Sequence, residues 1–159
     1  MEASLFAPAF AALVTWAALA VRGERFRPAS SPWQPPADVM SALERLESEL
    51  EGAGLAVPET AAWQKKLGPA GAEVLSLGYF LDRLVRVSQE FTYTARQLEG
   101  LRAKLAAHFA KKPTMNVAEF KESSGGSRKD AVPLLEHGDR VGWTARSGDE
   151  RKAGGKMGA

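Results

Sequence analysis

Apolar positions along this chain recur mostly with the period of an α-helix, and short alternating stretches separate the periodic segments. One stripe begins after Asp38, at spacings i, i+4, i+7 and i+11. Its members are Val39, Leu43, Leu46 and Leu50. A second stripe lies in residues 94–112, made of Leu98, Leu101, Leu105 and Phe109. We expect a helix at each place, the first capped by Asp38 and the second stopped by Pro113.

The segments after each long helix are shorter. Residues 58–67 and 73–85 predict two further helices behind the first long one, and the alternation in 85–87 and 91–93 predicts a half-buried hairpin. We expect four aromatic side chains of these helices and of the second long helix to be core. They are Trp63, Tyr79, Phe80 and Phe109.

The end of the chain repeats this order. Residues 117–123 predict a helix, Ser123-Ser124-Gly125-Gly126 a turn, and residues 128–141 another helix with Ser127 as its N-cap. A two-stranded ribbon follows and turns at Ser147-Gly148-Asp149. Three helices and a ribbon, occurring twice, predict a mainly α fold with small β-hairpins (α+β), built as tandem winged helix-turn-helix domains.

Ribbons of similar composition recur about every 60 to 65 residues, the size of one winged-helix unit. The Pro-rich stretch PASSPWQPP cannot continue a helix, so it marks a domain boundary. We therefore divide the chain into the following segments: 1–30, the tail of a preceding winged helix; 31–37, a linker; 38–94, a winged helix; 95–153, a C-terminal RNA-binding winged helix; and 154–159, a disordered tail.

The N-terminal run from Ala3 to Val21 carries no charge and approaches the length that crosses a bilayer. Ala dominates the run, Pro8 interrupts it, and Glu2 precedes it in place of the basic residues of a signal peptide. We favour a buried helix over a membrane segment, and expect a cytoplasmic protein without a membrane partner.

Charge and composition narrow the chemistry. The net charge is +2, and the basic excess lies after residue 110, where 10 Lys and Arg face 7 Asp and Glu. Without cysteine, and with only His108 and His137, the chain has no apparent metal site. No phosphate-binding glycine loop or catalytic triad is present, and we interpret Glu136 and Asp139 as a solvated helix face. We expect no enzyme activity and no cofactor.

Cations at a helix N-terminus oppose the helix dipole, so their presence there suggests a ligand. Ser127, Arg128 and Lys129 open the predicted helix 128–141 in this way. Such a helix end beside a basic ribbon is suited to a phosphate backbone. Four other basic residues extend the predicted nucleic-acid face: Lys121, Arg146, Arg151 and Lys152.

Five short motifs in fixed order carry a resemblance to a known family. They are VAEFK from Val117, GSRK from Gly126, AVPLLE from Ala131, Asp139-Arg140 and GDER from Gly148, and they include a proline inside the helix, Pro133. Together they resemble the last winged helix of the bacterial selenocysteine-specific elongation factor, SelB. Residues 38–112 resemble the preceding winged helix of that factor more loosely.

The resemblance implies a C-terminal fragment of a factor whose other parts bind GTP, selenocysteinyl-tRNA and the ribosome. It implies that this chain is a monomer that binds the selenocysteine insertion hairpin of mRNA and supports selenocysteine incorporation at UGA codons. Ser127, Arg128, Lys129 and Arg151 match the family motif of the RNA-binding residues. Four positions depart from the family pattern: Asp130, Gly138, Trp143 and Ala145. We expect Asp130 to face the phosphates and Gly138 to leave core volume unfilled.

Two other classes of function fit the same pattern. A transcriptional regulator would place the helix 128–141 in a DNA major groove, usually as a dimer on paired half-sites. A protein-interaction winged helix would bind no nucleic acid, and the near-neutral middle unit favours this role for residues 38–95.

Overall fold

A computed structural model describes residues 19–22, 25–28 and 34–158, and the chain divides into two units after Ala37. In the first unit, β1 (Leu19–Arg22) and β2 (Arg25–Pro28) form an antiparallel pair in which Leu19 lies opposite Pro28. Most of the uncharged N-terminal run lies outside the described residues. Within the described part of the chain, no helix has the length and apolar character needed to span a membrane.

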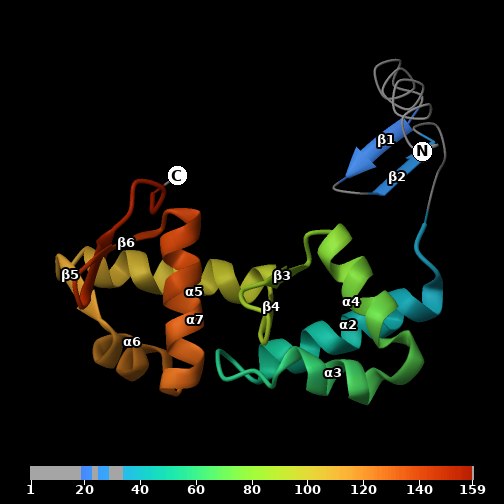
Figure 1. Cartoon of the computed structure of the whole chain (residues 1–159), viewed down its shortest axis with the longest axis horizontal. Helices are drawn as coiled ribbons and strands as arrows, with labels where there is room; N and C mark the ends of the chain where they lie inside the picture. Colours follow the sequence, from blue (N-terminus) through green and yellow to red (C-terminus); the bar gives the residue numbers. More distant parts are fainter. Residues whose placement is uncertain (1–18, 23–24, 29–33, 159) are drawn as a thin grey trace, which may run out of the picture. The chain divides into compact units, whose positions relative to one another are not determined.

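The second unit contains two winged helices in sequence (Figure 1). The elements of the first are α2 (Ala37–Gly52), α3 (Thr60–Leu67), the single turn η1 (Gly68–Ala70), α4 (Gly71–Phe80), β3 (Leu84–Arg86) and β4 (Thr92–Thr94). The apolar stripe of α2 is buried throughout, as predicted. Asp38 lies in the first turn of α2, one residue inside the helix, so its prediction as the N-cap was wrong.

Helix α4 ends at Phe80, five residues before the predicted end at residue 85. The chain leaves the helix through Asp82, whose φ of 55° is left-handed and cannot continue a right-handed helix. Leu84 then begins the hairpin, with Val85 opposite Tyr93. The predicted alternation of burial is absent from β4, where all three residues are buried.

The second winged helix has the same order with one more strand. Its elements are α5 (Ala95–Phe109), β5 (Thr114–Asn116), α6 (Val117–Ser124), α7 (Arg128–Val141), β6 (Thr144–Ser147) and β7 (Glu150–Ala153). The strands form one antiparallel sheet in the order β5-β7-β6, beside α5 (Figure 1). The sequence predicted only the ribbon of β6 and β7. The fold class, tandem winged helices of mixed α and β structure, is confirmed.

The core consists mainly of leucines from α2, α4, α5 and α7, with aromatic side chains between them. The largest completely buried side chains are Tyr93, Phe91 and Phe120. Of the four aromatics predicted to be core, Trp63 is buried, while Tyr79, Phe80 and Phe109 are partly exposed. The hydroxyl of Tyr93 donates a hydrogen bond to Leu55 O, so this polar group is buried with a partner.

Residues 154–158 are ordered by backbone contacts, contrary to the predicted disordered tail. The Gly154 N–H donates to Trp143 O, and the Lys156 N–H donates to Gly142 O. The guanidinium of Arg102 on α5 donates to the carbonyls of Lys156 and Met157. The sequence gives no periodic signal for residues 154–158, because main-chain hydrogen bonds hold them and these do not depend on side-chain type.

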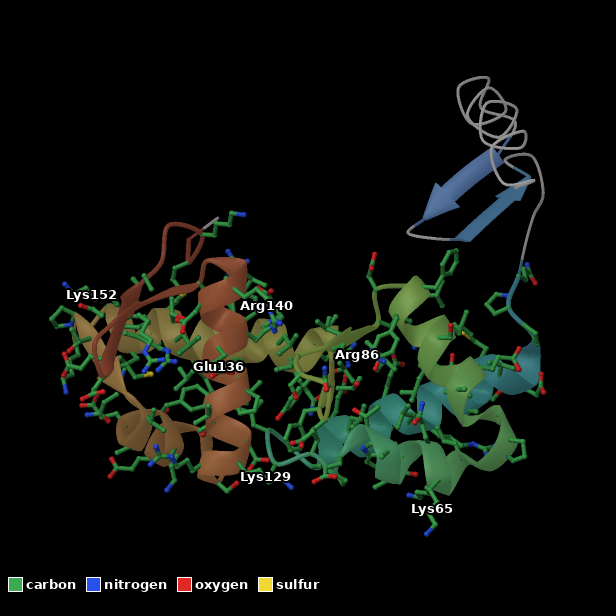
Figure 2. The ribbon with its side chains drawn as sticks, in the orientation of Figure 1. Lys65, Arg86, Lys129, Glu136, Arg140 and Lys152 are labelled. Carbon is green, nitrogen blue, oxygen red and sulfur yellow. The ribbon has the colours of Figure 1, made fainter. Side chains whose placement is uncertain are left out.

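Helix α7 also contacts the first winged helix at two points. Lys129, at its beginning, pairs with Glu59, and Arg140, near its end, donates a hydrogen bond of 2.6 Å to Val87 O (Figure 2). These contacts bridge 70 and 53 residues of chain. Two cations of α7 are therefore used between the winged helices.

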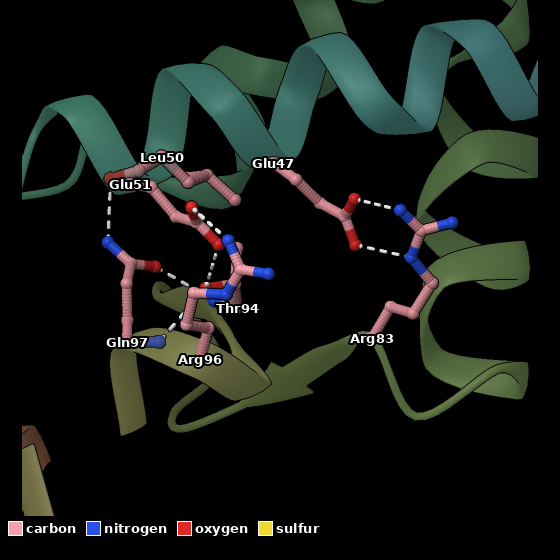
Figure 3. Close-up of polar contacts among 7 residues, drawn as sticks. All are labelled: Glu47, Leu50, Glu51, Arg83, Thr94, Arg96 and Gln97. Atoms are coloured by element: carbon pink, nitrogen blue, oxygen red, sulfur yellow. Dashed lines mark hydrogen bonds and ion pairs between the residues drawn. The ribbon is translucent and has the colours of Figure 1, made fainter. Parts of the chain in front are cut away.

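No linker separates the two winged helices, because Thr94 ends β4 and is also the N-cap of α5. Its hydroxyl accepts from the Gln97 N–H, and the Gln97 side chain accepts from the Thr94 N–H, which makes a capping box. The Gln97 amide also donates to Leu50 O at the end of α2, while Arg83 pairs with Glu47 (Figure 3). Helix α5 is thus anchored to α2 at its first turn.

Gly78 lies where the core leaves no room for a side chain. An added Cβ would overlap the side chain of Leu84 and lie 3.0 Å from Leu43 Cδ1, and both leucines are buried. We expect Gly78→Ala to lower the free energy of unfolding by about 1–2 kcal/mol, because overpacking outweighs the gain in helix propensity. Gly100→Ala is the matched control, since nothing lies within 4 Å of its added Cβ.

Thermal and urea unfolding of both variants provide the measurement. Gly100→Ala should raise the midpoint while Gly78→Ala lowers it. Equal stabilisation by both substitutions would contradict the packing of α4 described above.

Candidate nucleic-acid interface

A hollow of about 550 Å³ lies between the start of α6, one face of α7 and the wing formed by β6 and β7. We call it the helix–wing groove. The residues that line it are Asn116, Val117, Ala118, Arg128, Val132, Glu136, Arg146, Asp149 and Arg151. Arg128, Val132 and Glu136 are four residues apart on α7, so they share one face of the helix.

The turn before α7 aims the N-terminus of the helix. Gly125 has a φ of 69°, which ends α6 in the left-handed conformation that glycine adopts without strain. Asp130 accepts hydrogen bonds from the N–H and the hydroxyl of Ser127, at 3.0 and 2.6 Å. The expectation that Asp130 faces phosphates was wrong, because it is 7% exposed and serves to cap the helix.

Two of the predicted basic residues are exposed in the groove. Arg128, in the first turn of α7, makes no hydrogen bond or ion pair with any described residue. Arg146 is on β6, where its Nε donates 3.1 Å to Gly148 O and so fixes the guanidinium near the tip of the wing. One arginine on the helix and one on the wing are thus available to a ligand.

Arg151 lines the groove but is 5% exposed. Its Nε lies 3.0 and 3.2 Å from the two carboxylate oxygens of Asp139, and the same carboxylate accepts from the Thr144 hydroxyl. The sequence interpretation placed Asp139 on a solvated helix face. That interpretation was wrong, because its carboxylate is paired with Arg151. The geometry gives Arg151 a structural role, since its charge is already paired.

The other predicted basic residues do not line the groove. Lys129 pairs with Glu59 and lies 5.8 Å from the centre of the Phe91 ring, and its hydrogen bond to Glu59 raises the lysine pKa. Lys121 is exposed on α6, one turn beyond Val117. Lys152 is opposite Ala145 and adjacent in β7 to Arg151, so it projects from the other face of the sheet.

Two departures from the family pattern are accommodated by neighbours. A Cβ at Gly138 would lie 3.0 Å from Thr144 Oγ1, so this threonine occupies the space, and the expected unfilled volume is not present. Trp143 makes an edge contact of 5.5 Å with the ring of His137.

His137 is buried and accepts a 3.4 Å hydrogen bond at Nδ1 from Arg140, because a guanidinium can only donate. This hydrogen bond requires the neutral form of the imidazole. Burial, followed by the charge of Arg140, lowers its pKa. This residue supports the end of α7 and does not face the groove.

The sequence interpretation missed Val132, Glu136 and Asp149 as groove residues. The available signal was the spacing from Arg128, because Val132 and Glu136 follow it at i+4 and i+8. Nothing in the sequence placed Asp149 opposite them, because that proximity depends on how the wing packs. In the part of the chain that the structure describes, no cluster of His, Asp and Glu suited to a metal ion is found.

Comparison with known proteins gives one consistent similarity. Residues 107–153 match the family described as "Elongation factor SelB, winged helix". The chain is also similar to the selenocysteine-specific elongation factor of Desulfomicrobium baculatum, with 28% identity over 110 residues. That match includes 67% of this chain and 17% of the relative, so the chain spans about a sixth of the relative's length.

Two solved structures share the fold. The mRNA-binding domain of elongation factor SelB from E. coli, in complex with SECIS RNA, superposes with a TM-score of 0.60 and 17% identity, over 76% of this chain and 99% of that domain. A bacterial selenocysteine-specific elongation factor, EF-Sec, superposes with a TM-score of 0.64 and 23% identity, over 89% of this chain and 22% of that protein. These likenesses establish the winged-helix architecture.

The geometry predicts different consequences for two arginines of the groove. Arg151→Ala leaves the Asp139 carboxylate partly buried and unpaired, so we expect a loss of about 2–4 kcal/mol in the free energy of unfolding. Arg128→Ala removes an exposed side chain and should change stability by less than about 0.5 kcal/mol. Urea unfolding followed by circular dichroism measures both, and similar losses would contradict the assignment of Arg151 as structural.

The buried neutral His137 predicts a pH dependence of stability. Because its folded pKa is below the usual value of 6.5, the unfolded chain binds a proton more readily. Its contribution is complete above pH 6.5 and is lost as the pH falls toward the folded pKa. We expect the unfolding temperature to fall more steeply between pH 7.5 and 5.5 in the natural chain than in His137→Gln. Parallel curves would show that His137 titrates normally.

Proposed function

We propose that this chain binds an mRNA hairpin through the helix–wing groove, because residues 107–153 match the family described as "Elongation factor SelB, winged helix". The observation that carries the proposal is the placement of Arg128 on the helix and Arg146 on the wing, both exposed at one hollow. Two cations on separate elements can contact backbone phosphates on either side of a folded RNA.

The nature of the ligand follows from the relatives. The E. coli domain with this fold is titled as an mRNA-binding domain in complex with SECIS RNA, and the curated relative is a selenocysteine-specific elongation factor. We therefore infer that the ligand is a selenocysteine insertion hairpin. Proteins recognise such RNAs by shape and by exposed loop bases, which requires few phosphate contacts.

We also infer the wider role of the chain in translation from its similarity to these factors. The chain would act as the mRNA-binding arm of a cytoplasmic elongation factor that inserts selenocysteine at UGA codons. Ribosome binding, selenocysteinyl-tRNA binding and GTP hydrolysis would belong to other parts of that factor. The arm would bind as a monomer and need no cofactor.

Salt dependence tests the proposal. With Arg128, Arg146 and Lys121 as the available cations, about two to three phosphate contacts predict a slope of log K against log salt of roughly −1.5 to −2.5. The probe is a labelled hairpin from downstream of a selenocysteine UGA codon of the same organism, and binding is measured by fluorescence anisotropy. A slope near zero, or equal affinity for duplex DNA, would refute the proposal.

The matched variants are Arg128→Ala and Lys65→Ala, because Lys65 is an exposed lysine on α3, away from the groove. We expect Arg128→Ala to weaken hairpin binding about tenfold, as for the lower end of a lost charged hydrogen bond. Lys65→Ala should leave the Kd unchanged. Sedimentation of the free chain and of the complex checks that one monomer binds one hairpin.

A further inference from the structure

Helix α5 presents a side that neither the core nor the helix–wing groove uses. Its apolar stripe is buried, so the residues on the opposite side of the helix are exposed (Figure 1). Along the centre of that side, after Arg96, the exposed residues are small: Gly100, Ala103 and Ala107. An added Cβ at Gly100 would have nothing within 4 Å. This side of α5 is therefore open to a ligand.

Cations border the small residues along the same side. Arg96 is in the first turn of α5, Lys104 is in its middle, and Lys111 follows its end. Ala110 keeps helical backbone angles, with φ of −67° and ψ of −24°, so Lys111 continues the geometry of the helix. The following residues form what we call the α5 outer face: Arg96, Gly100, Ala103, Lys104, Ala107 and Lys111. None of them lines the helix–wing groove.

The beginning of this face is partly neutralised. Arg96 lies 3.4 Å from Glu51, although the arginine side chain is 84% exposed. The same arginine borders a hollow that four acids also line: Glu44, Glu47, Glu51 and Asp82. Arg96 is therefore the weakest of the cations on this face as a contact for an anion.

The middle and the end of the α5 outer face keep their charge. The side chains of its two lysines make no hydrogen bond or ion pair with any described residue. Glu99, on the flank of α5, lies 4.0 Å from Arg102, and Glu119 pairs with Lys112, which also attracts Glu150. These acids have cations of their own. A ligand that approaches this side of α5 therefore meets positive charge.

The size of these side chains disfavours a protein or a membrane as the partner. Protein interfaces depend on large apolar or aromatic anchors, and amphipathic helices enter membranes with the same kinds of side chain. The α5 outer face has only glycine and alanine between its cations. A second copy of the chain is also disfavoured. An antiparallel pairing about the central alanines would place Arg96 beside Lys111, and a parallel pairing would place each lysine beside its own copy, so like charges would repel.

The backbone of an RNA duplex has the complementary chemistry. The minor groove of A-form RNA is wide and shallow, and proteins bind it through phosphates and 2′-hydroxyls. Small side chains let a helix approach such a surface closely while the flanking cations contact phosphates. Lys104 follows Arg96 by about 12 Å along the helix, and Lys111 follows Lys104 by about 10 Å. These separations suit phosphates on the two sides of a groove better than neighbouring phosphates of one strand.

B-form DNA offers a less suitable surface. Its minor groove is only about 6 Å wide, and its major groove is recognised by side chains that reach the base edges. Glycine and alanine cannot reach them. The face therefore favours the shape of RNA.

We propose that the α5 outer face binds the phosphate backbone of an A-form RNA duplex, without recognising its sequence. This RNA is a second partner, separate from the hairpin in the helix–wing groove. The chain would then connect two RNAs through opposite uses of one winged helix: a groove for a particular hairpin, and an outer helix face for any duplex. The inference goes beyond the proposed function and does not depend on it.

The test combines two variants with two RNAs, using the complete 159-residue chain. Lys104→Glu/Lys111→Glu reverses the free charges of the α5 outer face, and Arg128→Ala changes the groove. The matched control is Arg45→Glu/Lys65→Glu, which makes the same change in charge at exposed positions of α2 and α3. The RNAs are the selenocysteine hairpin and a labelled, loop-free duplex of about 16 base pairs. Fluorescence anisotropy measures each Kd, and circular dichroism checks that each variant is folded.

We expect Lys104→Glu/Lys111→Glu to bind the duplex at least about tenfold more weakly than the natural chain, because two phosphate contacts become repulsions. Arg128→Ala and the control should bind the duplex like the natural chain. Hairpin binding should show the reverse, weakened by Arg128→Ala and unchanged in Lys104→Glu/Lys111→Glu. Ala107→Leu, which adds bulk without charge, should weaken duplex binding alone.

Unchanged duplex binding by Lys104→Glu/Lys111→Glu, or equal weakening in the control, would overturn the inference. Equal affinity for a DNA duplex of the same sequence, or no binding of the RNA duplex by the natural chain, would overturn it as well. A natural chain that binds the duplex in the expected pattern but binds no hairpin would overturn only the proposed function.

Discussion

The Asp139 carboxylate, near the end of α7, holds together the three elements on which the C-terminal winged helix depends. It accepts hydrogen bonds from Thr144 at the start of β6 and from Arg151 in the middle of β7. An acid near a helix C-terminus is opposed by the helix dipole, so it persists there only with such partners. The same contacts fix the wing at one distance from α7. The helix–wing groove is the space between these two elements.

Helix α7 consequently has three different faces. Leu134 and Leu135 are buried in the core, and Arg128, Val132 and Glu136 line the groove. Lys129 and Arg140 contact the first winged helix. The pair of cations at the N-terminus, which suggested one binding site, therefore divides between a ligand surface and a contact within the chain. The negative charge of Asp130 in the first turn of α7 also offsets the unfavourable effect of Arg128 and Lys129 on the helix dipole.

The sequence predicted what a single helix or hairpin determines. The apolar stripes located α2 and α5, and Ser127 located the start of α7, because these signals act over a few residues. Helix α5 ends at Phe109, three residues before the end that Pro113 predicted. The sequence interpretation missed β5, whose three residues are too short for a period of two and become a strand only by pairing with β7. The structural role of Arg151 and the position of Glu136 in the groove were also missed. Each depends on a neighbour brought close by tertiary packing, Asp139 in one case and the wing in the other.

The winged-helix fold alone does not decide between DNA and RNA, so the decision falls to the groove. A duplex offers regularly spaced phosphates, and a protein that binds it gains affinity from many cations at once. This groove has only two exposed arginines, and Glu136 and Asp149 lie beside them. Such a mixture is unsuited to an extended backbone, and this supports the proposed recognition of a folded RNA hairpin. The departures from a uniformly basic surface therefore favour recognition of a particular RNA shape over general attraction to nucleic acid.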